Sequence, residues 1–291
     1  MDIIDVDAPF GARITHIDLR ETLPHKDVER IYRLVTERNV VVIPDQRLSA
    51  VQQAAFSARF GPLISHASYE YNHPEHDKVL IISNVKEGGR PIGIDDAGSY
   101  WHSDFSYLLR PSFATILYGV EIPEGRGDTL FIDMYAAYEA LDEGMKARIA
   151  GLSARHAHVT AGGRWAREFR PDGIPPAETE KAALLDSDFR AAAAVVHPIV
   201  KVHPDSGRRC LYVHPCFTHE VPGLAPEESD ALLRALFTHM TRPQFQWRHR
   251  WARNDVVMWD NRCTTHAATT SALPAGCRRR LHRTSVEARS F

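Results

Sequence analysis

Apolar residues along the chain recur with two periods. Over residues 26–38, four of them follow helical spacing: Val28, Ile31, Leu34 and Val35. The same reading predicts helices over 49–61, 136–152 and 226–240. In the first of these, Ser49 and Gln52 fit a capping box, and Gly61 fits a helix stop.

Shorter apolar or alternating runs predict strands at 11–20, 40–44, 78–85, 114–120, 128–134, 245–251, 255–260 and 278–286. Residues 195–213 are expected to form a hairpin that turns at Pro-Asp-Ser-Gly. Strands outnumber helices and do not alternate regularly with them, which argues against a doubly wound sheet. The pattern therefore predicts an α+β fold built on a β-sandwich or barrel, with residues 1–291 in one domain.

One long stretch, residues 160–192, shows no clear period and contains several glycines and prolines. Long segments of this kind inside a compact domain are usually functional or disordered. We interpret it as a candidate lid.

Composition narrows the class of partner. The 291 residues are 44% hydrophobic, and 35 basic against 37 acidic residues give a net charge of −2, which does not favour nucleic acid as a partner. No apolar run approaches the roughly 18–20 residues of a membrane span. The four cysteines have no Cys-x-x-Cys spacing, and the chain opens with an acidic segment. We expect a cytoplasmic protein with free thiols, acting either as a monomer or as a homo-oligomer.

The stretch Trp-His-Ser-Asp-Phe-Ser-Tyr, residues 101–107, holds the main candidate chemistry. If it is extended, His102 and Asp104 leave the same face of a strand. An isolated His-x-Asp is more often a polar strand face than a metal site. Here a third candidate ligand, His266, follows the predicted strand 255–260 after a short polar turn. Two histidines and one carboxylate on one face of iron leave positions open, as Fe(II) oxygenases need.

Arginines in the final predicted strand suggest an organic-acid cosubstrate. A guanidinium binds a carboxylate through two parallel hydrogen bonds, which suits a dicarboxylate such as 2-oxoglutarate. By strand parity, Arg279, Leu281 and Arg283 share one face, and Arg278 and Arg280 lie on the other, where surface charge is the expected role. Asp260 is expected in a turn or in support of a ligand.

These segments together resemble the taurine dioxygenase and phenoxyacetate-herbicide dioxygenase family of Fe(II)/2-oxoglutarate enzymes. The resemblance runs over nearly the whole chain and includes FGARITHIDLR, FSARFGPL, WHSDFSY, GDTLFIDMYAAYEAL, HPIVKVHPDSGRRCLYV, DVVMWDNRCTTH and RRRLHRTSV. It implies a double-stranded β-helix (jelly-roll) core with flanking helices.

The resemblance also implies roles for individual residues. His102, Asp104 and His266 would bind iron. Thr129 and Arg279 would hold the distal carboxylate of 2-oxoglutarate, and Arg283 would lie near both the cosubstrate and the acidic group of the substrate. Because the loop after His266 is about two residues longer than in the taurine enzyme, the choice among Arg278, Arg279 and Arg280 depends on the register of the final strand.

Candidate substrate-binding residues are His66, Tyr69, Tyr71, Phe105 and Arg283. His66 and Tyr69 match positions that contact taurine in the family, with a loop histidine and a packed tyrosine as the alternative. The aromatic residues could equally be ordinary core. Taurine itself is not expected, since Ala97 and Gly98 stand where the taurine enzyme has an acidic residue and an amide.

The sequence therefore predicts an oxygenase that uses Fe(II), 2-oxoglutarate and dioxygen. It would hydroxylate a C–H bond of a small anionic substrate (a sulfonate, sulfate ester or carboxylate) and release succinate and CO2. One alternative keeps the cofactors but desaturates an amino-acid derivative or forms an isonitrile from it. An alternative of another class is a non-catalytic jelly-roll binding protein.

Overall fold

The computed structural model describes residues 1–66, 69–95, 98–158, 163–171, 194–271, 273–274 and 276–287. Most of the candidate lid, 160–192, lies outside these residues, and its described part contains helix α5 (Gly163–Glu168). Within the described part of the chain, no helix combines the length and the apolar character that crossing a membrane requires.

The largest sheet has eight strands, which are all antiparallel to their neighbours except for the parallel pair β2 and β3. In spatial order they are β1 (Asp2–Asp5), β2 (Ala12–Thr15), β3 (Val40–Ile43), β16 (Val256–Asp260), β8 (Ser112–Glu121), β18 (Arg280–Glu287), β5 (His76–Ser83) and β4 (Asn72–His73). The strands of this sheet come from both ends of the chain, so the fold closes only when the last strand, β18, pairs with β8 and β5.

Four smaller sheets complete the β-structure. The sheet that matters most for the site joins β15 (Gln246–His249), β9 (Thr129–Asp133) and β17 (Thr264–Ala268). The others are β11 (Ala194–Pro198) with β10 (Ser153–Ala157) and β14 (Thr218–Glu220), β12 (Val200–Val202) with β13 (Arg209–Leu211), and β6 (Lys86–Glu87) with β7 (Arg90–Pro91).

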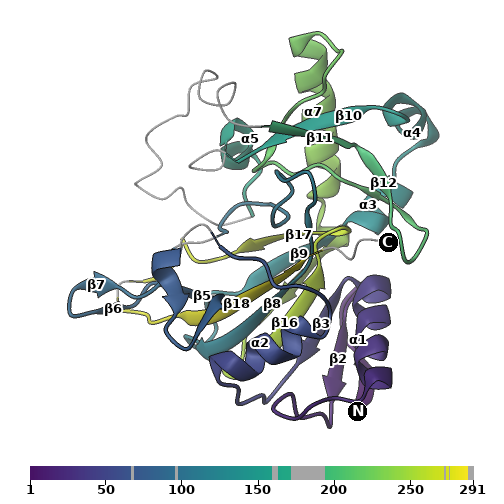
Figure 1. Cartoon of the computed structure of the whole chain (residues 1–291). Helices are drawn as coiled ribbons and strands as arrows, with labels where there is room; N and C mark the ends of the chain where they lie inside the picture. Colours follow the sequence, from purple (N-terminus) through teal and green to yellow (C-terminus); the bar gives the residue numbers. More distant parts are fainter. Residues whose placement is uncertain are drawn as a thin grey trace.

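Helices lie against both parts of this β-structure. Besides α5, they are α1 (His25–Arg38), α2 (Ala50–Ala58), α3 (Met134–Glu139), α4 (Glu143–Ile149) and α7 (Pro226–Met240), with single 3-10 turns at η1 (Tyr69–Tyr71) and η4 (Pro243–Phe245). In Figure 1, α1 and α2 flank the large sheet in the lower half of the view, and α7, β10 and β11 occupy the upper half.

The large sheet is buried on both faces. Along β3, Val41 and Ile43 pack toward α1, where they meet Ile31, whereas Val40 and Val42 pack with Phe131 of the smaller sheet. Successive side chains of a strand point to opposite faces, so a continuous apolar strand such as β3 fits this position. The layer between the large sheet and β15-β9-β17 also contains the cavity described below.

Several sequence predictions are confirmed and others need correction. Helices α1 and α7 lie where predicted, and Ser49 and Gln52 form the predicted capping box of α2, although this helix ends at Ala58 rather than near Gly61. The predicted helix 136–152 is in fact two helices, because Asp142 accepts a hydrogen bond from the backbone of Met145 and starts α4 anew.

The predicted hairpin 195–213 is also shorter than expected. Only β12 and β13 pair as a hairpin, through Val200 with Leu211, Lys201 with Cys210 and Val202 with Arg209. The preceding strand β11 pairs with β10 instead, and the chain bends at Ile199, between β11 and β12. Sequence alternation alone could not distinguish these partners.

The capping box of α2 gives a stability prediction. Ser49→Ala removes the side-chain acceptor for the backbone N–H of Gln52, at 3.2 Å, and we expect it to lower the free energy of unfolding by about 1 kcal/mol. Val51→Ala in the same helical turn, at a half-exposed position, is the control and should change little. Urea unfolding measures both, and equal midpoints for the two variants would contradict the assignment.

Candidate active site

A cavity that opens to solvent lies between the large sheet and the sheet β15-β9-β17, with about 400 Å³ of empty space when the solvent at its mouth is included. Polar and charged side chains from several strands converge in it: His102, Asp104, Thr129, His266, Arg279 and Arg283. The remaining lining residues are Ile82, Gly98, Leu117, Trp259, Ala268 and Leu281. All six polar residues were singled out from the sequence for the metal or the cosubstrate.

His102 and His266 face each other across an antiparallel bridge. The backbone N–H of His102 donates to the carbonyl of His266 at 3.0 Å, and the reverse bond is 2.8 Å. His266 lies inside β17, whereas His102 lies in a loop. The bridge therefore brings together two imidazoles that are 164 positions apart, with ring centroids 4.1 Å from each other.

Residues 101–107 are not extended, so the condition under which the sequence placed His102 and Asp104 on one strand face is not met. Beyond the single bridge at His102, the chain turns at residues 104–107, and Phe105 adopts a left-handed backbone with φ of 59°. The serine hydroxyl of Ser103 donates to the carbonyl of Asn261 at 2.6 Å, which competes with a regular strand ladder. His102 and Asp104 nevertheless converge, because the turn folds the carboxylate back beside the imidazole.

The three candidate ligands form a compact buried group. His102 Nε2 lies 3.6 Å from Asp104 Oδ1, and His266 Nε2 lies 3.8 Å from Asp104 Oδ2. One potential ligand atom from each residue lies within 4.8 Å of the other two. Ligand atoms that each lie roughly 2 Å from one metal are about 3–4 Å from one another, which agrees with the separations of 3.6 and 3.8 Å. The donor set of two imidazoles and one carboxylate fits Fe(II).

The protonation states also suit a cation. His102 Nδ1 lies 2.7 Å from the carbonyl of Tyr100, which can only accept, so Nδ1 is the ring nitrogen that donates there and Nε2 is the one directed toward Asp104. Burial first, and then the neighbouring His102, hold the pKa of His266 well below its ordinary value, so this imidazole is neutral. Burial alone would raise the pKa of Asp104, but Arg283 and the two histidines outweigh it and hold that pKa well below its ordinary value.

Arg279 and Thr129 lie at another part of the cavity wall. The guanidinium of Arg279 is buried, and its Nε donates to the carbonyl of Gly127 at 3.0 Å. A Cβ at Gly127 would approach Arg279 Cδ to 2.8 Å, so glycine is needed there. Thr129 Oγ1 accepts a hydrogen bond from Trp251 Nε1 at 3.0 Å, which leaves the hydroxyl proton of Thr129 available to a ligand.

The final strand has the predicted parity. Arg279 precedes β18, and Arg279, Leu281 and Arg283 all line the cavity. Arg278 is exposed and pairs with Glu121, as expected for a surface charge. Arg280 is half-buried rather than exposed, so the expectation of surface charge holds only for Arg278.

The predicted substrate-binding residues are spread over a wider area. Arg283 Nη2 donates to His66 Nδ1 at 3.1 Å, and the His66 ring packs against Phe105 with centroids 5.9 Å apart. Tyr71 is half-buried in η1, and the side chain of Tyr69 and residue Ala97 lie outside what the structure describes. A Cβ on Gly98 would lie 2.9 Å from His102 Cε1, so the position where the taurine enzyme has an amide has no room for a side chain here.

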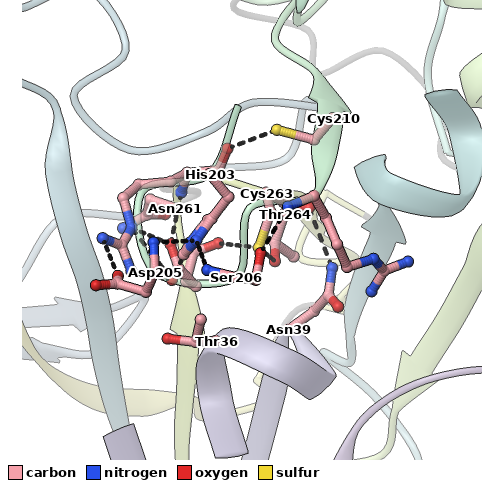
Figure 2. A network of polar contacts seen from close by, with 12 residues as sticks. Thr36, Asn39, His203, Asp205, Ser206, Cys210, Asn261, Cys263 and Thr264 are labelled. Carbon is pink, nitrogen blue, oxygen red and sulfur yellow. Dashed lines mark hydrogen bonds and ion pairs between the residues drawn. The ribbon is translucent and has the colours of Figure 1, made fainter. Parts of the chain in front are cut away.

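A second group of potential ligands, His203, Asp260 and Cys263, lies outside the cavity lining. His203 and Cys263 belong to the network of polar contacts shown in Figure 2. Arg262 donates to both carboxylate oxygens of Asp260, and His203 Nε2 donates to Oδ2 at 3.0 Å. Burial raises the pKa of the Cys263 thiol well above its ordinary value, so no thiolate is available. With the arginine already neutralising Asp260, this group is structural, in line with the turn role expected from the sequence.

Sequence reasoning missed two polar residues that support the candidate ligands. Thr115 Oγ1 donates to Asp104 Oδ2 at 2.6 Å, and the amide of Asn261 donates to Thr115 Oγ1 at 3.0 Å. Thr115 is the one polar residue in the buried stretch 113–117 of β8, and such an isolated polar residue at a buried position was the available signal.

Comparison with known proteins agrees with this geometry. The family described as "Taurine catabolism dioxygenase TauD, TfdA family" matches residues 2–285. The alpha-ketoglutarate-dependent 2,4-dichlorophenoxyacetate dioxygenase of Cupriavidus pinatubonensis is 34% identical over 287 residues, covering 95% of this chain and 94% of that protein. Pentalenolactone F synthase of Streptomyces arenae is 32% identical over 263 residues, covering 89% and 87%.

Solved structures are similar over the same extent. A taurine dioxygenase from Burkholderia xenovorans superimposes with a TM-score of 0.79 and 32% identity, covering 99% of this chain and 89% of that one. The structure of AAD-2 in complex with Mn(II) and N-oxalylglycine gives a TM-score of 0.79 at 26% identity, covering 99% of both chains. By sequence and by structure, the chain belongs to the taurine catabolism dioxygenase TauD, TfdA family.

Proposed function

We propose that this protein is an Fe(II)- and 2-oxoglutarate-dependent oxygenase that hydroxylates a C–H bond of a small organic acid. One observation carries the proposal: two imidazoles and a carboxylate converge in the same cavity as a buried arginine and a threonine hydroxyl. A binding protein without catalysis would not need a cation site with free coordination positions beside a site for a dicarboxylate. Members of the family named above are dioxygenases that depend on alpha-ketoglutarate.

The core of this enzyme is a double-stranded β-helix within a single catalytic domain. The large antiparallel sheet faces β15-β9-β17 across the cavity, which is the arrangement of two opposed sheets expected of a jelly-roll. The likeness to the taurine dioxygenase structure over 99% of the chain supports the same conclusion. The four free cysteines fit a reducing compartment, and we propose the cytoplasm as its location.

Each polar group of the cavity has a task in this proposal. His102, Asp104 and His266 hold Fe(II), and Arg279 with Thr129 binds the distal carboxylate of 2-oxoglutarate. When bound, Fe(II) and 2-oxoglutarate would supply a two-electron oxidation of the substrate. One atom of dioxygen would go to succinate, as CO2 leaves, and the other to the hydroxyl group of the product. The apolar wall formed by Ile82, Leu117 and Leu281 keeps water from competing for the charged groups.

The substrate anion is recognised by Arg283 and His66. Because an arginine can only donate, His66 Nδ1 must accept from it, and the proton of this imidazole resides on Nε2. Burial first, and then the charge of Arg283, lower the pKa of His66 to about 3, so the ring is neutral. Its buried Nε2–H has no protein partner among the described residues and can donate to a carboxylate or sulfonate oxygen.

A second candidate is the same cofactor chemistry with a different oxidative outcome, such as desaturation or isonitrile formation on an amino-acid derivative. The observation in its favour is the similarity to a relative named as a synthase, pentalenolactone F synthase. A panel of sulfonates, phenoxyalkanoates and amino-acid derivatives, scored for succinate release and for product mass, separates the candidates. Hydroxylation raises the mass of the substrate by about 16 units, and desaturation lowers it by about 2 units.

The proposed iron ligands give the first functional prediction. His102→Ala, Asp104→Ala and His266→Ala should each abolish succinate production and stoichiometric Mn(II) binding while leaving the protein folded. His25→Ala, at an exposed position in α1, is the matched histidine control and should behave like the unaltered protein. A triad variant that kept near-normal turnover would remove that residue from the ligand set.

The proposed cosubstrate site gives the second functional prediction. Arg279→Ala removes a charge-assisted pair worth about 1.5–3 kcal/mol, which corresponds to roughly ten- to a hundredfold weaker 2-oxoglutarate binding. Arg279→Lys should restore only part of the affinity, because the two-pronged guanidinium is lost. Arg278→Ala is the control, since Arg278 is exposed. Calorimetric titration with 2-oxoglutarate measures all three, and a large effect at Arg278 instead would overturn the assignment.

The proposed anion site, formed by Arg283 and His66, gives the third functional prediction. Arg283→Ala and His66→Ala should raise the KM for the organic acid roughly tenfold or more, as expected for loss of a hydrogen bond to a charged group. Because Arg283 also approaches Asp104 Oδ1, at 3.5 Å, its variant should lower kcat as well, whereas His66→Ala should act mainly on KM. An unchanged KM for the acid in both variants, with a raised KM for 2-oxoglutarate, would assign these residues to the cosubstrate.

A further inference from the structure

A single buried asparagine is bonded to the segments that carry the three candidate iron ligands. Asn261 follows β16 in the turn that leads into β17, five residues before His266, and its side chain is almost fully buried. Its backbone carbonyl accepts from Ser103 Oγ, the residue between His102 and Asp104, and its backbone N–H donates to the carbonyl of Phe113 at 2.8 Å.

The orientation of the Asn261 amide is determined by its neighbours. The indole Nε1 of Trp259 can only donate, and it lies 2.9 Å from Asn261 Oδ1, so the amide oxygen must face it. The amide nitrogen therefore faces the opposite way and donates to Ser112 Oγ at 2.8 Å and to Thr115 Oγ1 at 3.0 Å. Both amide protons are used.

This orientation determines where the Thr115 proton points. Because Thr115 Oγ1 accepts from Asn261, its one proton is free to donate to Asp104 Oδ2, 2.6 Å away. Trp259, Asn261 and Thr115 thus form a one-way chain of donors that ends on the carboxylate. Hydrogen bonds in such a chain polarise one another, and the last bond is strengthened because its acceptor is charged.

The other carboxylate oxygen has different neighbours. Asp104 Oδ1 lies 3.6 Å from His102 Nε2 and 3.5 Å from Arg283 Nη1. The carboxylate is therefore held in one rotational state, with Oδ2 bonded to Thr115 and Oδ1 directed toward His102 and Arg283. Without the Thr115 hydroxyl, the carboxylate could turn to bond Arg283 more closely.

The turn that carries Asn261 is itself fixed. The side chain of Asp260 is hydrogen-bonded to His203 and Arg262, and its backbone N–H donates to the carbonyl of Asn39 at 3.0 Å. Arg262 also pairs with Asp205 at 2.8 Å, which ties the turn to the β12–β13 hairpin. Asn261 is thus anchored from both flanks, and its amide acts as a rigid support.

We propose that Thr115 and Asn261 are positioning residues that orient Asp104 for metal binding, acting through the donor chain Trp259–Asn261–Thr115–Asp104. The inference rests on the proposed function, since it assumes that Asp104 is a metal ligand. Neither Thr115 nor Asn261 lines the cavity. Their effect is on the direction and freedom of the Asp104 carboxylate.

Two variants at Thr115 test the proposal through metal affinity. Thr115→Val keeps the shape and removes the hydroxyl, and it should weaken Mn(II) binding by roughly ten- to a hundredfold, the usual effect of losing a partner of a ligand. Thr115→Ser keeps the hydroxyl and should bind within a few-fold of the unaltered protein. Mn(II) does not need dioxygen or turnover, and free Mn(II) is counted by its paramagnetic resonance signal.

A third variant tests the direction of the donor chain. Asn261→Asp has the same shape but offers Thr115 an acceptor, so the hydroxyl proton can turn from Asp104 to the new carboxylate. It should weaken Mn(II) binding at least as much as Thr115→Val. Thermal unfolding of each variant is recorded alongside, and Thr115→Val supplies the readout should Asn261→Asp fail to fold.

The matched control is Thr284→Val. Thr284 is also fully buried in the large sheet, and its hydroxyl lies 2.7 Å from Ser57 Oγ of α2, outside the cavity lining. It should lose stability without losing Mn(II) affinity. Equal Mn(II) affinity in Thr115→Val and the unaltered protein would overturn the positioning role alone. Equal affinity in His266→Ala and the unaltered protein would overturn the metal site, and with it both proposals.

Discussion

The backbone bridge between His102 and His266 is the interaction on which the site depends. Its two hydrogen bonds join a loop to β17, an edge strand of the smaller sheet, and bring the imidazole centroids to 4.1 Å from each other. The bridge forms only if β17 is already paired with β9 and if the loop before β8 passes over it. The three candidate ligands therefore assemble as a consequence of sheet pairing, and no local sequence signal could do this alone.

A buried carboxylate is the second constraint. Removing a charge from water is costly unless it is paired and hydrogen-bonded. Asp104 meets this requirement through the charge of Arg283 and through the hydrogen bond from the Thr115 hydroxyl. The same arrangement keeps the carboxyl ionised and the imidazole of His266 neutral. Fold stability and cation affinity thus place the same demand on this group, namely that it stay charged and stay oriented.

The arginines near the final strand lie in two different environments. Arg279 and Arg283 line the cavity, four positions apart, whereas Arg278 lies in solvent beside Glu121. Arg279 is held by its backbone as well as by its side chain, since Asn84 Oδ1 accepts from its N–H and Ser83 Oγ donates to its carbonyl. A rigid guanidinium loses little freedom when it binds a carboxylate, which favours affinity for a dicarboxylate.

The sequence by itself determined the helices with a strong apolar period, α1 and α7, the continuous buried strand β3 and the parity of Arg279 and Arg283. These features depend on neighbours within a few positions. Only the tertiary structure decided that residues 104–107 turn, that β11 pairs with β10, and that Asn261 supports Asp104 through Thr115, 146 positions away. The role of the Thr115 hydroxyl depends on which groups the fold places beside it, because a hydrogen bond is specified by distance and direction in space rather than by order along the chain.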